Sequence, residues 1–213
     1  IDQRLDRDAH RTLTFEWIVD EPIHVGIGKG DGDVRKIAAA QPMRSQGRAV
    51  IPGSSWKGVF RHRIESILAV AGADTQTIDD LLELLFGSNR VGRGLLWFHD
   101  SLAPTEHEVS RTHIAIDRFT GGVRDGALFQ VDAMDRRQDL TLRVVSPRPI
   151  PRAVANLVLH VAHDIADGLV GVGGNVSRGY GTLIPLTLLA PTDPVDLTEL
   201  TALLGAREEG VRA

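Results

Sequence analysis

The sequence contains no cysteine, so disulfide bonds and zinc sites built from thiolates are excluded. It also lacks any run of about 18 consecutive apolar residues, the length at which a segment becomes a candidate transmembrane helix. The N-terminal segment IDQRLDRDAH is polar and does not resemble a secretory signal peptide. These absences together predict a cytoplasmic protein that has no membrane partner.

The composition is that of a globular protein with a substantial core. Of the 213 residues, 42% are hydrophobic and 24% are charged, which is enough apolar material for one medium-sized domain. No segment has the composition of an interdomain linker. We therefore expect a single domain over residues 1–190 and a peripheral C-terminal tail over residues 191–213.

Acidic residues are absent from one long part of the chain. Residues 34–64 contain seven Lys or Arg and no Asp or Glu, whereas residues 74–108 contain seven acids and two bases. The net charge of −4 argues mildly against a nucleic-acid partner, but such segregation is expected when one face meets a polyanion. A solvated basic surface would carry the same pattern, so charge alone leaves both interpretations open.

Hydrophobic periodicity predicts a mixed fold. Alternating or β-rich segments predict strands at 13–28, 94–103, 126–134, 140–146 and 182–190. Periodic segments predict three helices, which begin near Ser54, Thr77 and Arg152, and a small helix at residues 197–204 is expected in the tail. Two strand–helix–strand units along the chain then indicate an α+β fold with an antiparallel, ferredoxin-like sheet.

The segment IPGSSWKG places small and basic residues at the start of a predicted helix. Ser54 or Ser55 can cap this helix, and its free N–H groups and dipole suit a phosphate. Lys57 and Arg61, which are four residues apart, add positive charge on one helical face. The alternative is an ordinary serine cap beside two solvated bases.

Four glycines surround Arg178 and Tyr180 in the segment VGGNVSRGYGTL. The segment follows a helix and precedes a strand, which is the reverse of a dinucleotide-binding fingerprint. Arg178 can reach a phosphate, and Tyr180 can stack on a base or simply pack. Turn chemistry alone would also explain the glycines.

A Gly-Gly turn divides residues 116–134 into a predicted hairpin, with Arg118, Phe119, Arg124 and Phe129 around it. Exposed aromatic residues on such a hairpin can wedge between bases, although both phenylalanines could instead be core residues. Among the histidines, His24 could act as a general base. His160 and His163 are more typical of a surface or structural pair.

Three segments, VIPGSSWKGVFRHRIESIL, IAIDRFTGGVRDGALFQVDAM and GVGGNVSRGYGTL, resemble the RAMP superfamily in this order, and most closely the RNA-binding backbone subunit of type III CRISPR effector complexes. The resemblance covers roughly residues 13–189. It implies a modified RRM-like core with a β-hairpin thumb, placed at about 110–145. It also implies copies that stack along a guide RNA, other CRISPR effector subunits as partners, and a target RNA held in antiviral defence.

The resemblance further implies metal-dependent endoribonuclease activity, carried by an aspartate two residues before a proline. Here the segment AAAQP places Ala40 at that position, ahead of Pro42. The nearest acids are Asp31 and Asp33, which a shift of the loop could bring into place. Mg²⁺ or another divalent ion is expected only if the protein cleaves RNA, and no cofactor is expected for binding.

The leading hypothesis is therefore an RNA-binding subunit. We expect guide phosphates at Ser54, Ser55 and Lys57, and a channel lined by Arg44, Arg48 and Arg61. We expect further contacts on the thumb and on the segment VGGNVSRGYGTL, residues 172–183, called the glycine loop: Gly173, Gly174, Arg178, Gly179, Tyr180, Arg118 and Arg124. The alternatives are a metal-dependent nuclease that uses Asp31 or Asp33, and a stand-alone guide-processing nuclease that uses His24.

Overall fold

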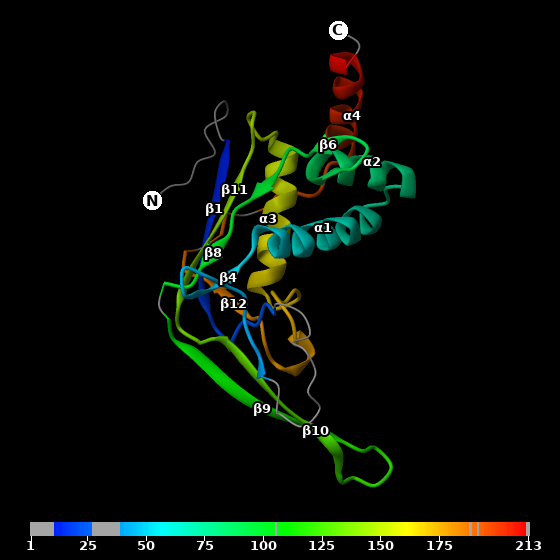
Figure 1. Cartoon of the computed structure of the whole chain (residues 1–213). Helices are drawn as coiled ribbons and strands as arrows, with labels where there is room; N and C mark the ends of the chain where they lie inside the picture. The colour runs from blue at the N-terminus through cyan, green and yellow to red at the C-terminus, as the bar shows by residue number, and fades with distance from the viewer. Residues whose placement is uncertain (1–10, 27–38, 105, 188, 191, 212–213) are drawn as a thin grey trace.

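The computed structural model describes residues 11–26, 39–104, 106–187, 189–190 and 192–211. For residues 39–40, 125–127 and 206–211 it describes the backbone only. Figure 1 shows a mixed body of helices and strands, from which one long hairpin extends at the end opposite to the C-terminal helix.

The core is one antiparallel sheet with two helices packed on it. The sheet has the order β12-β1-β11-β7, with β1 at Thr12–Val19, β7 at Trp97–Phe98, β11 at Asp139–Val145 and β12 at Leu183–Pro185. Helix α1 (Gly53–Val70) follows β1, and α3 (Arg152–Ala166) connects β11 to β12. This βαββαβ order with spatial order 4-1-3-2 is the ferredoxin-like topology, which confirms the α+β fold.

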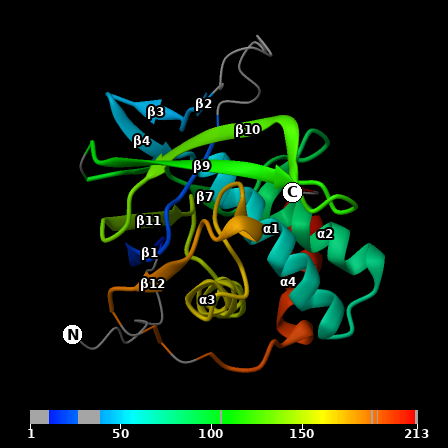
Figure 2. The same ribbon diagram turned by 90° about the horizontal axis from the view of Figure 1, so that it is seen from below.

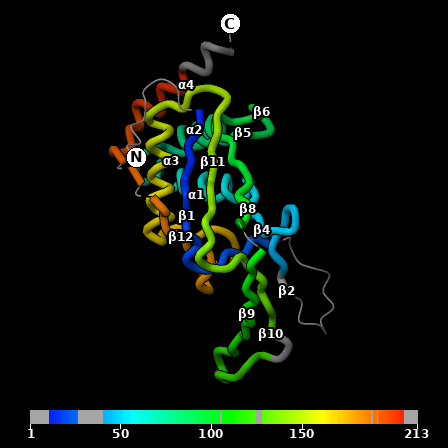
Figure 3. The backbone as a smooth tube through the Cα atoms, turned by 90° about the vertical axis from the view of Figure 1, so that its left-hand side faces the viewer, coloured from blue at the N-terminus to red at the C-terminus, as the bar shows by residue number. Residues whose placement is uncertain are grey.

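Alternation explains which face of the sheet is buried. In β1, Phe15, Trp17 and Val19 point to the helices and are almost fully buried, while the residues between them are more exposed. The same holds for alternate residues of β11. Figure 3 shows β1, β11 and β12 side by side, with α1 and α3 on the far side of the sheet. The axes of α1 and α3 point in different directions, as Figures 1 and 2 show. The helices therefore cover one face of the sheet and leave the other open.

The helices follow from their periodic apolar residues, but their starts differ from the sequence prediction. Helix α1 begins at Gly53 after Pro52, and neither Ser54 nor Ser55 caps it, so that prediction was wrong. Pro52 has an extended backbone, which ends the preceding strand and starts the helix without a side-chain cap. Helix α2 (Thr75–Phe86) is followed by Gly87, whose φ of 78° is a left-handed value that favours glycine at the end of a helix.

The hairpin is an insertion between β7 and β11. Its strands are β9 (Glu108–Ile116) and β10 (Val123–Met134), joined by the predicted Gly-Gly turn. Strand β11 pairs with β1 in the core sheet, so the hairpin ends at Met134 rather than near residue 145. Strand β2 (Ala39–Ala40) pairs in parallel with residues 130–131 of β10, which places residues 39–40 beside the hairpin.

Short strands connect these parts. Strands β3 (Arg44–Ser45), β4 (Arg48–Ile51) and β8 (Ser101–Leu102) form a small sheet before and beside α1. Strands β5 (Gly87–Ser88) and β6 (Gly92–Arg93) form a tight hairpin after α2. The glycine loop contains a single 3-10 turn, η1 (Val176–Arg178).

The C-terminal segment is tied to α3. Asn156 donates to the Asp193 carbonyl at 2.8 Å and accepts from the Asp193 N–H at 3.0 Å. His160 contacts the same carbonyl at 2.8 Å, which gives this histidine a structural role. Helix α4 (Leu197–Val211) follows, and its Leu200 belongs to the main core with 1% of its surface exposed. The expected tail thus contributes to the core, and the boundary at residue 190 stays a prediction.

Within the part of the chain that the structure describes, no helix is long and apolar enough to cross a membrane.

Candidate nucleic-acid interface

The first turn of α1 is held against the end of the core sheet. The Gly53 N–H donates to an Asp100 carboxylate oxygen at 2.8 Å, so an acidic side chain already satisfies this donor. A Cβ on Gly53 would lie 2.0 Å from the Phe98 carbonyl oxygen, and only glycine allows this close approach. The helix start is therefore a packed junction, in which one amide that a phosphate could use is occupied.

A cleft of about 840 Å³ opens beside this turn. Its lining combines three residues of α1, Gly53, Ser54 and Lys57, with residues from the end of α2 through β7: Phe86, Gly87, Ser88, Asn89, Gly92, Arg93, Gly94, Leu96, Trp97 and Phe98. Two of these residues are cationic and none is acidic. The cleft therefore has the charge expected of an anion-binding surface.

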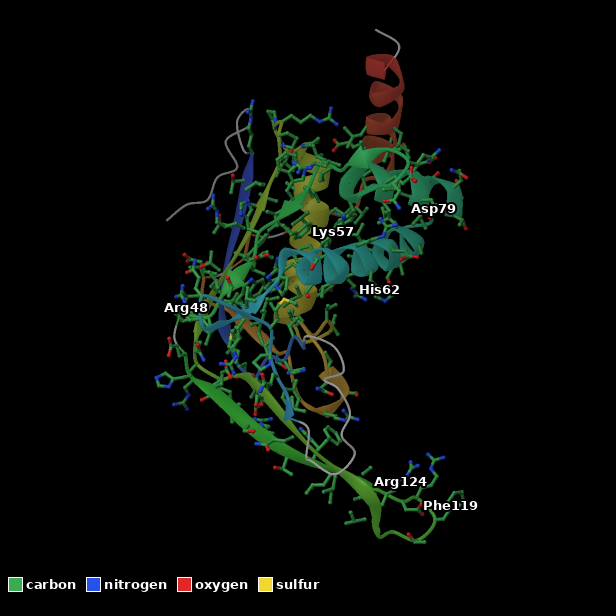
Figure 4. All side chains as sticks on the ribbon, in the orientation of Figure 1. Arg48, Lys57, His62, Asp79, Phe119 and Arg124 are labelled. Atoms are coloured by element: carbon green, nitrogen blue, oxygen red, sulfur yellow. The ribbon has the colours of Figure 1, made fainter. Side chains whose placement is uncertain are left out.

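The other basic residues of the 34–64 segment diverge. Arg44 forms an ion pair of 2.6 Å with Glu108 at the hairpin base. Arg61 approaches the Leu82 carbonyl of α2 at 3.4 Å, and Arg63 pairs with Asp164 of α3 at 2.7 Å. Arg48 lies on β4, near the left edge of the view in Figure 4, whereas Lys57 lies on α1. The described basic residues of this segment therefore contribute to several separate surfaces rather than to one continuous channel wall.

The glycine loop packs against the start of the 20–26 segment. The Gly174 N–H donates to the His24 carbonyl at 2.7 Å, and the Gly181 N–H donates to the Pro22 carbonyl at 2.9 Å. Gly173 and Gly181 have φ values of +92° and +83°, and a Cβ there would lie 2.5 Å and 2.3 Å from backbone oxygens. These two glycines are needed for the fold of the loop itself.

Arg178 and Tyr180 lie at the base of the hairpin, but only one of them is exposed. The Arg178 guanidinium lies 5.0 Å from the ring centroid of Phe129. Tyr180 is 1% exposed, and its hydroxyl is 2.7 Å from His113 Nε2. The interpretation of Tyr180 as a base-stacking residue was therefore wrong, because its ring is already packed against the hairpin.

His24 is also enclosed. Its ring Nδ1 is 2.8 Å from the Asp132 carbonyl oxygen, and only 6% of the residue is exposed. A Cβ on Gly26 would lie 2.7 Å from His24 Nε2, so the second ring nitrogen faces backbone at close range. A general base must reach the proton that it removes, and His24 in this position contacts the protein rather than an open surface.

The tip of the hairpin is open to solvent. Arg118 and Arg124 are exposed, and Phe119 is 92% exposed. Figure 4 shows Phe119 and Arg124 together at the tip, away from the helices. Phe129 lies nearer the base and packs against His113. The two phenylalanines thus differ: Phe119 fits the expected wedge, and Phe129 is a packing residue.

The position of the expected catalytic aspartate lies beside the hairpin. Ala40 pairs with Val131 in the β2–β10 ladder. Asp31 and Asp33 lie outside the described residues. Among the residues that are described, no group of three or more His, Asp or Glu side chains could hold a metal ion. The described residues near Ala40 therefore do not supply a set of ligands for the divalent ion that cleavage would use.

Sequence reasoning missed Trp97, Arg93 and Arg111. The segment GLLWFHDSLA was interpreted only as a strand, whereas Trp97 is 36% exposed and Arg93 lies over its ring at 5.2 Å. Alternation could have indicated this, because Phe98 next to it packs inward. Arg111 contacts Tyr180 and Glu21, and no local pattern marks that long-range arrangement.

The chain belongs to the RAMP superfamily, whose family profile matches residues 19–184. The match begins at the last residue of β1, ends within β12, and contains α1, α3 and the inserted hairpin. Membership in this superfamily supports a CRISPR-associated function in RNA binding. No curated protein matches the chain significantly.

Proposed function

We propose that the protein is the RNA-binding backbone subunit of a type III CRISPR effector complex, where it holds guide RNA and target RNA in antiviral defence. The observation that carries this proposal is the hairpin β9–β10, an insertion in a RAMP ferredoxin-like core. Its tip combines two arginines with an aromatic side chain that the fold leaves exposed. Other CRISPR effector subunits and further copies of this chain are the proposed protein partners.

The hairpin tip suits a wedge between paired strands. Phe119 has 92% of its surface exposed, so burial in this chain does not account for an aromatic residue there. An aromatic ring stacks on any base, since every base has a π-face. Arg118 and Arg124 beside it can contact phosphates on either strand.

The basic residues proposed to contact the guide RNA come from separate elements. Lys57 is the fifth residue of α1, Arg44 lies on β3, and Arg178 lies at the end of the 3-10 turn. Contacts from such residues go to phosphates and carry no sequence information directly. This property suits a subunit that must accept a guide of any sequence.

Co-expression with the other effector subunits and a CRISPR array tests this proposal. We expect the wild-type chain to purify with guide RNA, and chemical probing to find unstacked guide nucleotides at regular spacing. Phe119→Ala should weaken that periodic pattern, whereas Val70→Ala should not, although Val70 is also apolar and is 90% exposed. Purification without guide RNA, or identical patterns for both variants, would contradict the proposal.

Target cleavage is a second, separable proposal, which depends on Asp31 or Asp33. The assembled complex is incubated with complementary RNA and Mg²⁺. Regularly spaced products that disappear with Asp31→Ala or Asp33→Ala would establish cleavage by this chain. Intact target RNA would leave a subunit that binds without cutting. A stand-alone processing nuclease has less support, because His24 is buried beneath the glycine loop.

A further inference from the structure

The cleft beside α1 has a composition suited to more than a phosphate. Its polar lining includes Lys57, Ser88, Asn89 and Arg93, and its aromatic lining includes the partly exposed Trp97. Its volume of about 840 Å³ is within the range of small-molecule sites. A cation, amide and hydroxyl groups, and an indole ring on one surface are the groups that recognise a nucleotide.

Trp97 is held in a fixed orientation on the surface. Its indole N–H donates to the Gly94 carbonyl at 2.8 Å, and the Arg93 guanidinium lies 5.2 Å from the ring centroid. The neighbouring Phe98 packs between Phe60 and Phe86, at centroid distances of 5.1 Å and 6.0 Å. Because Phe98 anchors the strand in the core, the outward side chain of Trp97 is rigidly presented.

Trp97 differs from the other two tryptophans. Trp17 and Trp56 are fully buried, with 0% of their surface exposed, whereas Trp97 is 36% exposed on the edge strand β7. Packing in the core thus accounts for Trp17 and Trp56, whereas part of the Trp97 side chain remains exposed to solvent. A rigid, partly exposed indole next to a guanidinium is a stacking platform for a nucleobase.

We propose that this cleft binds one nucleotide of single-stranded RNA, with the base stacked on the Trp97–Arg93 pair and the phosphate at Lys57. The amide of Gly53 is occupied by Asp100, so Lys57 rather than the free helix end supplies the charge. Asn89 and Ser88 line the same cleft and can contact the base edge or the ribose. The inference rests on the proposed function and adds a base-stacking subsite, distant in sequence from the hairpin tip.

Intrinsic fluorescence tests the subsite directly, because Trp97 is the tryptophan that a ligand can reach. Short oligoadenylate and oligouridylate are titrated into the full-length protein, with an abasic ribose-phosphate oligomer of equal length as the control ligand. We expect saturable quenching by both base-containing oligomers and none by the abasic one. Trp97→Phe should remove the signal while fluorescence anisotropy of labelled RNA shows that binding persists.

Variants separate stacking from charge. Trp97→Ala should weaken RNA binding about fivefold or more without changing its salt dependence, since stacking releases no counterions. Lys57→Ala should weaken binding and lower the salt slope. Trp97→Phe keeps a stacking ring, so its affinity should lie close to that of the wild type. Melting curves of each variant verify that the fold is retained.

The results distinguish this subsite from the broader function. RNA binding with unchanged fluorescence and unchanged Trp97→Ala affinity would overturn the subsite and leave the proposed RNA-binding role standing. Quenching by the abasic oligomer equal to that by RNA would also overturn base stacking. Failure of the wild type and all variants to bind any RNA would overturn both.

Discussion

At the base of the hairpin, the hydroxyl of Tyr180 is 2.7 Å from His113 Nε2, and the ring is buried between the glycine loop and the hairpin. Burial raises the pKa of the Tyr180 hydroxyl, while the nearby Arg111 and Arg178 lower it. The neutral tyrosine therefore serves as a connection between two segments that are distant in sequence. Its role is to hold the loop in place.

Replacing Tyr180 with Phe should remove one partly buried hydrogen bond and keep the packing. We expect a loss of about 1 kcal/mol in the free energy of unfolding, with RNA affinity nearly unchanged. Thermal denaturation should show a midpoint lowered by about 2–4 °C. A large loss of RNA affinity with no loss of stability would restore the base-stacking role for this residue.

Glu108 is a second residue whose environment has a measurable consequence. Burial raises its pKa above the ordinary value of 4.5; the Arg44 guanidinium opposes this shift, and the Asp132 carboxylate adds to it. The folded protein thus holds this proton more tightly than the unfolded chain does. The resulting stabilisation is complete below the unfolded pKa and is lost as pH rises through the folded pKa.

The stability of the wild type relative to Glu108→Gln should therefore fall as the pH rises from about 4 to about 7. Urea denaturation of both proteins across this range measures the difference. Asp117→Asn is a matched control, because hydrogen bonds from Thr120 and Phe119 lower the pKa of Asp117 below 3.8. The stabilisation from Asp117 is complete above about pH 5, so the stability difference between the wild type and Asp117→Asn should be constant from about pH 5 to about pH 7. A stability difference between the wild type and Glu108→Gln that stays constant or rises with pH would contradict this expectation.

At the scale of elements, the glycine loop contains two kinds of glycine. A Cβ on Gly181 would meet the Val172 carbonyl oxygen at 2.3 Å, whereas a Cβ on Gly179 would meet nothing within 4 Å. Both have positive φ, of +83° and +77°. The first glycine is required by internal packing, and the second leaves an open surface that a ligand can approach.

Gly181→Ala should therefore cost about 3 kcal/mol or more, from the positive φ and the backbone clash together. Gly179→Ala carries the φ cost alone, about 1–2 kcal/mol. If RNA passes close to Gly179, the added methyl group should also lower RNA affinity. Denaturation measures the stability loss of each variant, and RNA-binding titrations measure the change in affinity. Equal stability losses for Gly181→Ala and Gly179→Ala would contradict the close packing described for Gly181.

The sequence predicted those elements whose residues carry their own periodicity or turn chemistry. Helix α3 and the hairpin are examples, since one has apolar residues at helical spacing and the other has a Gly-Gly turn. The strands β3, β5 and β6 were not predicted, because each has only two residues and therefore no period to detect. The burial of Tyr180 and the exposure of Trp97 depend on contacts distant in sequence, which a local pattern does not encode.

At the scale of the whole molecule, the surfaces proposed to contact RNA lie on different elements of one RAMP fold. Lys57 lies on α1, Arg178 at the glycine loop, and Phe119 at the hairpin tip. Figure 4 shows the tip well separated from α1. An RNA that contacts all three must follow the protein over a long path. The net charge of −4 is compatible with this, because the contacts are local.

The most direct test of RNA binding is the salt dependence of affinity for single-stranded RNA, measured by fluorescence anisotropy on the purified protein. The account predicts that affinity falls with salt, and that Lys57→Ala and Arg178→Ala each reduce the slope by about 0.7 per lost phosphate contact. Arg63→Ala is the control, since Arg63 pairs with Asp164 at 2.7 Å, and it should leave the slope unchanged. Binding that is absent, or slopes that are the same in all four proteins, would contradict the account.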